Sequence, residues 1–186
     1  MTMWFSYCKR ILGHIFRLLG IFLVVGVLGT FAMIYSGVFN VAATVVNAAP
    51  LSWLLVTVRE ASIGRNARDI QAPALTDAAN RDNGFRIYRE SCAMCHTPVG
   101  RTATPMAVGF NPQPPTFGKD ADDMTAGELF WVAKNGIRFT AMPAWGPSRS
   151  DKELWDVVEF LMTLQKMSAA DYDAIDRRIP PEPPTQ

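Results

Sequence analysis

Apolar positions near the N-terminus form a continuous run rather than a periodic pattern. No charged residue occurs from Leu18 to Val58, and the stretch from Leu18 to Phe39 is almost entirely apolar. About 20 such residues cross the hydrocarbon core of a bilayer as a helix. The apolar region of a cleaved signal peptide is shorter, at roughly 7 to 15 residues. The pattern therefore predicts an uncleaved transmembrane helix within residues 1–40.

A second apolar stretch, LSWLLVTV, follows Pro50 and gives way to a segment with Arg59, Arg65 and Arg68. This sequence of apolar and then basic residues is typical of a helix at a membrane surface, and it suits a surface for a partner subunit equally well. Pro73 then breaks any continuing helix. We expect residues 41–77 to form an interfacial helix and a linker, and the next domain to begin near Thr76.

Helical periodicity dominates from residue 78 onward. Phe85, Tyr88, Cys92 and Cys95 follow one another at i, i+3, i+7 and i+10, which places them on one face of a helix. Five prolines then fall between residues 98 and 115, and this density predicts a loop without regular secondary structure.

Capping signals mark two further helices. Thr125 with Glu128 forms a capping box before AGELFWVAKN, which Gly136 can close in a left-handed conformation. Ser150 with Glu153 repeats the device before DKELWDVVEFLMTLQ. No strand alternation occurs, so we expect an all-α domain over residues 78–167, followed by a short helix and a Pro-rich tail over residues 168–186.

Composition and charge restrict the functional classes. The chain has 186 residues, enough for one domain of about 100 to 150 residues plus the apolar segment. Its net charge is only +1, which disfavours nucleic-acid binding. Lys9, Arg10 and Arg17 are the only charged residues before Arg59, and all three precede the apolar span. By the positive-inside rule the N-terminus is cytoplasmic, which in a bacterial inner membrane places the remainder in the periplasm.

The most specific motif is C-A-M-C-H, formed by Cys92, Cys95 and His96. This is the attachment signature of c-type haem, because two nearby thiols can each add across a vinyl group while the next imidazole reaches the iron. A structural zinc would need about four ligands, and the only other Cys and His are Cys8 and His14, on the far side of the predicted span. A dithiol redox pair would be expected at the start of a helix in a βαβ unit, which is absent. The motif therefore indicates one covalently bound haem c on the exported side.

His96 supplies one axial ligand to such a haem, and the other could be a methionine, a histidine, water or an exogenous ligand. His14 is excluded as the second ligand because it lies on the far side of the predicted span. Met142 lies in the irregular segment IRFTAMPAWGP between the two capped helices, with Pro143 stiffening the backbone. The other methionines of the exported part lie within or close to the attachment motif or in the helical pattern, namely Met94, Met106, Met124, Met162 and Met167. Met142 is therefore the candidate distal ligand.

Residues 78–166 resemble the class I cytochrome c family in three places. The attachment motif is followed by an M-P-x-W segment at Met142, as in many bacterial single-haem members. Gly84 and Tyr88, together with the VVEFL run around Phe160, resemble the family's crossing pair of terminal helices. The PPTF stretch resembles the family's P-x-L segment. This match implies that the Pro115 carbonyl accepts a hydrogen bond from the His96 ring, with Pro112 and Pro114 as close competitors.

The resemblance implies a one-electron carrier rather than an enzyme, because two protein ligands leave no open position on the iron. Its redox partners would be a dehydrogenase, an oxidase or a soluble cytochrome. The anchored chain would work either as a tethered shuttle or as the cytochrome subunit of a membrane complex. The alternative is a haem-based gas sensor or a peroxidase-like enzyme in which Met142 dissociates to admit a ligand.

Overall fold

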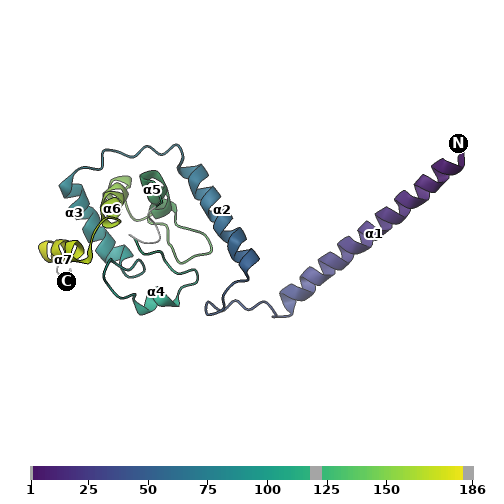
Figure 1. Cartoon of the computed structure of the whole chain (residues 1–186), viewed down its shortest axis with the longest axis horizontal. Coiled ribbons are helices and arrows are strands. Elements are labelled where there is room, and N and C mark those ends of the chain that lie inside the picture. The colour runs from purple at the N-terminus through teal and green to yellow at the C-terminus, as the bar shows by residue number, and fades with distance from the viewer. Residues whose placement is uncertain (1, 118–122, 182–186) are drawn as a thin grey trace. The chain divides into compact units, whose positions relative to one another are not determined.

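The computed structural model describes residues 2–117 and 123–181, so the end of the Pro-rich tail, residues 182–186, lies outside the described residues. These residues form helices and connecting loops without a strand, which confirms the all-α expectation. The chain divides into two compact units, one up to Val45 and one from Val46 onward. The elements are α1 (Thr2–Tyr35), α2 (Ala49–Ala67), α3 (Ala78–Ile87), η1 (Tyr88–Cys92), α4 (Pro105–Gly109), α5 (Ala126–Asn135), α6 (Asp151–Leu164) and α7 (Ala169–Arg178) (Figure 1).

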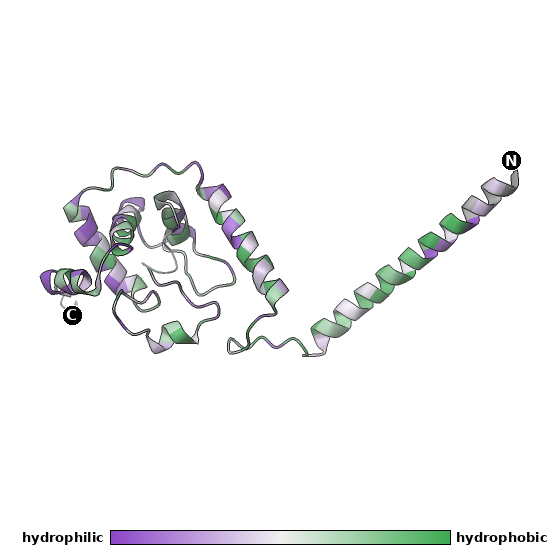
Figure 2. Ribbon diagram, viewed as in Figure 1, coloured by the Kyte–Doolittle hydropathy of each residue, from purple (hydrophilic) through white to green (hydrophobic). Residues whose placement is uncertain are grey.

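The first unit consists of α1 and the residues that follow it. Within α1, Arg10–Tyr35 is long and apolar enough to cross a membrane, and none of it is buried against other parts of the chain. Figure 2 shows hydrophobic residues around most of this helix. A helix that is apolar on all sides is typical of a membrane span, because a helix at the surface of a soluble domain has a polar face.

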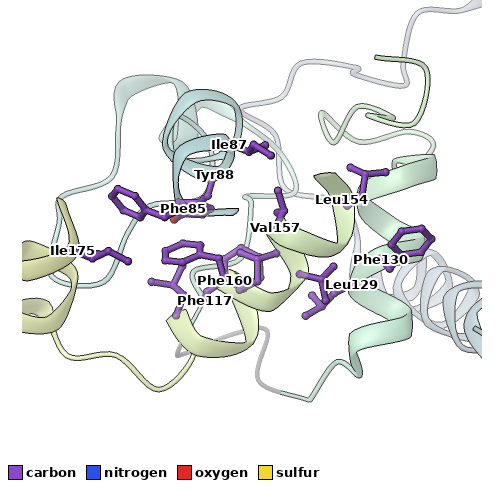
Figure 3. Packing of buried hydrophobic residues seen from close by; sticks show 14 of the residues in the cluster. Phe85, Ile87, Tyr88, Phe117, Leu129, Phe130, Leu154, Val157, Phe160 and Ile175 are labelled. Carbon is purple, nitrogen blue, oxygen red and sulfur yellow. The ribbon is translucent and has the colours of Figure 1, made fainter. Parts of the chain in front are cut away.

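In the second unit, α3 and α6 cross at Gly84. A Cβ on Gly84 would lie 1.9 Å from the backbone oxygen of Asp156 and 3.0 Å from Cβ of Phe160. Only glycine permits this approach. The close crossing then stacks aromatic rings from both helices, with Phe160 centred 5.3 Å from Phe85 and 5.2 Å from Tyr88. Figure 3 shows these rings together in the hydrophobic core.

Helix α7 belongs to the same core, although the sequence placed it in a separate segment. Its side chains Tyr172 and Ile175, and Ile179 just beyond it, are buried. The Tyr172 ring lies 5.8 Å from that of Phe85 in an edge-to-face arrangement, which is favourable for aromatic pairs. A capping box of Ser168 and Asp171 opens this helix.

Helix α2 packs on α5 through its C-terminal half. Ile63 and Ala67 are buried, and a Cβ on Gly127 in α5 would lie 3.0 Å from the carbonyl oxygen of Ile70. The missing side chain at Gly127 therefore makes room for the backbone that follows α2. The compact unit accordingly begins at Val46, well before the start near Thr76 that the sequence suggested.

The Pro-rich stretch holds a short helix, α4, which the sequence analysis excluded. Thr104 caps it by accepting a hydrogen bond from the backbone N–H of Ala107, and Pro105 occupies the first turn. Proline is well tolerated there because the first N–H groups of a helix have no partner within the helix. The high density of prolines predicted a loop, but Thr104 and Pro105 together form the start of a helix.

Candidate functional site

A pocket opens between the C-terminal end of α3, η1, α5, α6 and the segment that joins α5 to α6. Together with space open to solvent, it measures about 420 Å³. Most of the wall is apolar, with Ile87, Leu154, Val157 and Leu161 among its side chains. Cys92, His96 and Met142 line this same pocket.

The two cysteines of the attachment motif occupy different surroundings. Helix α3 continues into the wider turn η1, in which the N–H of Ala93 donates to the Tyr88 carbonyl. Cys92 ends this turn in the pocket wall, whereas Cys95 is not among the lining residues, and its Sγ lies 3.9 Å from Sδ of Met106. The sequence predicted that both cysteines lie on one face of a regular α-helix. The wider turn η1 changes the direction of the residues beyond it, so Cys95 does not share the position of Cys92.

The backbone after η1 turns back at the motif and brings the His96 ring toward the pocket. The N–H groups of Cys95 and His96 both donate to the Cys92 carbonyl, at 3.0 and 2.8 Å. The Tyr88 hydroxyl donates to the His96 carbonyl at 2.6 Å, so a core side chain fixes the histidine backbone. No short-range sequence pattern indicated this role of Tyr88, which depends on the fold of the turn.

Nδ1 of His96 lies 3.0 Å from the carbonyl oxygen of Pro115. The imidazole tautomer that carries its proton on Nδ1 donates to this oxygen and leaves the lone pair on Nε2 free to ligate a metal. Burial lowers the pKa of His96, and the hydrogen bond to Pro115 opposes this effect. The lowered pKa favours the neutral ring, the form in which histidine ligates metals. Among the three prolines considered from the sequence, the geometry selects Pro115.

Met142 lies in a loop whose two ends are fixed to the end of α5. The N–H of Ile137 donates to the Met142 carbonyl at 3.1 Å, and the N–H of Trp145 donates to the Ala133 carbonyl at 3.0 Å. Gly136 begins the loop with φ of 67° and ψ of −174°. Its φ is positive, but its ψ lies outside the left-handed helical region expected from the sequence. A Cβ at Gly136 would approach Ala144 N to 2.7 Å, so the tight closure requires glycine.

Arg149 is the charged side chain of the pocket wall. Its guanidinium donates to the Ser91 hydroxyl at 3.1 Å and forms ion pairs with Glu90 and Glu153 at 3.2 and 3.3 Å. Burial raises the pKa of the Cys92 thiol to about 12, although the nearby Arg149 charge acts in the opposite direction. The sequence places Arg149 among the charged residues near the expected haem edge, whereas it gives no signal for Ser91, which belongs to no motif.

The tryptophans separate into two environments that the sequence could not distinguish. Trp145 lines the pocket. Trp155 instead stacks on Phe130, with ring centroids 4.2 Å apart and planes 12° from parallel, and so joins α6 to α5.

The side chains present fit an iron porphyrin. A thiol, an imidazole nitrogen and a thioether sulfur, the three functional groups expected to hold a c-type haem, border one apolar pocket. The carbonyl that orients the imidazole is in place. His96 and Met142 are the side chains that would hold the iron of such a group.

Comparison with known families agrees with this geometry. Residues 79–161 match the family model described as Cytochrome C oxidase, cbb3-type, subunit III. The matched region runs from the start of α3 into α6 and includes the attachment motif, Pro115 and Met142. No curated protein matches the chain. The matched part of the second unit is therefore similar to a c-type cytochrome domain, and the match supports a haem c electron-transfer protein.

Proposed function

We propose that this chain is a membrane-anchored, one-electron carrier with a single haem c, attached through Cys92 and Cys95 and ligated by His96 and Met142. The observation that carries the proposal is the shared pocket of Cys92, His96 and Met142, with the Pro115 carbonyl 3.0 Å from Nδ1 of His96. When bound, the haem supplies a one-electron redox couple. The surrounding side chains decide how that couple is tuned and protected.

The chain's residues act mainly by ligation and exclusion. Pro115 orients the imidazole and raises its basicity, because its carbonyl accepts the Nδ1 proton. Met142 would be the second protein ligand of the haem, and methionine ligation would raise its reduction potential. The apolar side chains of α6 keep water away from the site. With His96 and Met142 both bound to the haem, small-molecule substrates would have no access to the metal.

The anchor and its orientation complete the proposal. Helix α1 crosses the bacterial inner membrane once, with the N-terminus in the cytoplasm and the haem domain in the periplasm. Two features support this topology. Lys9, Arg10 and Arg17 lie before the uncharged span, and covalent attachment of haem to such motifs takes place on the exported side.

The partners are other redox proteins, and the chain works as a tethered shuttle or as a subunit of a respiratory or dehydrogenase complex. The matched family is described as a subunit of a cytochrome c oxidase, which favours a role close to such a complex. Purification in mild detergent separates the two modes. A monodisperse single polypeptide supports the shuttle, whereas a stoichiometric complex supports the fixed subunit.

The central test is the visible spectrum of the reduced holoprotein before and after addition of carbon monoxide at neutral pH. We expect no change, because His96 and Met142 close both axial positions. A rapid shift to a carbon monoxide complex would contradict the carrier and would indicate a labile sixth position. Sensing or peroxidase-like chemistry would then become the better explanation.

A further inference from the structure

Helix α2 has two halves with different surroundings. Its C-terminal half packs on the cytochrome domain through the buried side chains of Ile63 and Ala67. Its N-terminal half, residues 49–58, exposes large apolar side chains, with Trp53 69% and Val58 59% exposed. Figure 2 shows the more hydrophilic residues toward the C-terminal end of this helix. A large apolar surface on a compact domain indicates a binding surface.

The outward face of α2 changes character along its length. Arg59, Ile63 and Ala67 repeat every four residues and lie toward the domain, because each is partly or fully buried. Leu54, Val58 and Arg65 lie on the other side of the helix and are exposed. This outer face therefore begins apolar and ends basic, which is the order expected for a helix that enters the acyl boundary at one end and meets phosphate headgroups at the other.

The apolar character of α2 continues from the anchor without a break. Residues 36–48, which connect α1 to α2, contain no charged residue. Five exposed large apolar side chains lie in this connection, namely Val38, Phe39, Val41, Val45 and Val46. The first charge after Arg17 is Arg59, in the middle of α2. A connection that crossed water would be polar. Because this uncharged stretch continues directly from the membrane-spanning helix, its composition points to lipid.

The charges in and just after α2 indicate whether electrostatic attraction or apolar burial would hold this helix at a membrane. Arg59 pairs with Glu60 at 3.3 Å and Arg68 pairs with Asp69 at 3.0 Å, so the basic end has little excess charge. Burial of the apolar side chains must then supply most of the attraction, and binding should depend weakly on salt. Residues 49–58 are too few to span a bilayer, which leaves the lipid–water interface as their location.

We propose that the N-terminal half of α2 lies in the lipid–water interface and holds the cytochrome domain on the membrane surface in one orientation. The proposal rests on the anchor described under the proposed function. Because α2 is a single helix whose other half packs on α5, the lipid-bound half fixes the domain itself. The movable part of the tether is then residues 36–48, before α2, and not the stretch after it that the sequence suggested.

A photo-crosslinking experiment with the full-length holoprotein in native membranes tests this inference. A benzophenone amino acid replaces Leu54 or Val58 on the outer face of α2. Matched probes at Leu23 in the span and at Ala170, an exposed position of α7, serve as the lipid and water references. We expect lipid adducts at Leu54 and Val58 in several-fold higher yield than at Ala170. Equal yields at all three positions, or adducts with a second polypeptide at Leu54 and Val58, would overturn the proposal.

A charge variant provides a second measurement. With the probe at Val58, Leu54→Glu should reduce the lipid adduct several-fold, whereas Ala170→Glu should leave it unchanged. An unchanged adduct in Leu54→Glu would contradict an interfacial α2. The haem spectrum of each variant reports an intact domain. Retention of the chain in membranes after an alkaline carbonate wash tests the α1 anchor separately, so a failure of α2 binding is distinguishable from a failure of the anchor.

Discussion

The backbone oxygen of Asp156 occupies the space that a side chain on Gly84 would need, since a Cβ at Gly84 would lie only 1.9 Å from it. Two helices far apart in the sequence thus touch backbone to backbone. This contact positions α6, and α6 carries Leu154, Val157 and Leu161 into the wall of the pocket.

We expect Gly84→Ala to destabilise the domain, because the added methyl group must push α3 away from α6. Overpacking of this kind costs about 1–3 kcal/mol, more than the gain of about 1 kcal/mol from the better helix propensity of alanine. Chemical denaturation followed by circular dichroism measures the change. Gly109→Ala is the matched control, since a Cβ there meets nothing within 4 Å. Equal stability of both variants would contradict the close crossing.

Met142→Ala should open the sixth coordination position while leaving the domain folded. We expect a lower reduction potential and the acquisition of carbon monoxide binding, because water or nothing replaces the thioether sulfur. Redox titration and the visible spectrum measure both effects. Met106→Ala is the control, since Met106 is half exposed and contacts Cys95 outside the pocket lining. A normal spectrum in Met142→Ala would assign the distal ligand elsewhere.

Replacing Cys92 or Cys95 should reduce the covalent retention of haem, whereas replacing Cys8 should not. We expect Cys92→Ser to retain haem through at most one thioether bond and the double variant with Cys95→Ser to retain none covalently. Cys8→Ser should bind haem as the unmodified chain does. Haem staining after denaturing electrophoresis, with the mass of the chain, gives the number of bonds. Two thioether bonds in Cys92→Ser would refute the assignment.

The ion pair between Asp82 in α3 and Arg178 in α7 predicts a pH-dependent contribution to stability. The hydrogen bond from Arg178 lowers the pKa of Asp82 below its ordinary value of 3.8. A lowered folded-state pKa stabilises the fold above the unfolded-state pKa, and the contribution is lost as pH falls through the folded-state pKa. The unmodified chain should therefore have a higher Tm than Asp82→Asn at pH 6, and the difference should shrink below about pH 4.

Thermal unfolding at several pH values measures this difference. Asp69→Asn is a suitable control, because Asp69 is 84% exposed and pairs with the adjacent Arg68. Its Tm should match that of the unmodified chain throughout. A difference for Asp82→Asn that stays constant down to pH 2 would show that charge is not the cause.

Features encoded by neighbouring residues could be predicted from the sequence. The capping boxes of Thr125 with Glu128 and of Ser150 with Glu153 form as expected, because each needs only four consecutive residues. The short helix α4 was missed where proline density outweighed the local start signal at Thr104. The docking of α2 on α5 could not be predicted, since it depends on space left by Gly127, some sixty residues away from the contacting side chains.

The candidate site shows the same division. The attachment motif and the loop of Met142 are visible in the sequence, and their roles as haem ligands stay predictions. The choice of Pro115 over its neighbouring prolines required the geometry of the loop around His96. The separation of Cys95 from the pocket lining depends on the wider turn η1, for which the residues Tyr88 to Cys92 offer no distinctive pattern.

The crossing of α3 with α6 also sets an order of events during synthesis. A polypeptide is made from its N-terminus, so the segment with Cys92 and Cys95 emerges before α6 exists to cover it. The wall formed by Leu154, Val157 and Leu161 can close only after most of the domain has been made. Cys92 therefore remains uncovered by α6 throughout that interval, and the packing of α6 on α3 ends it.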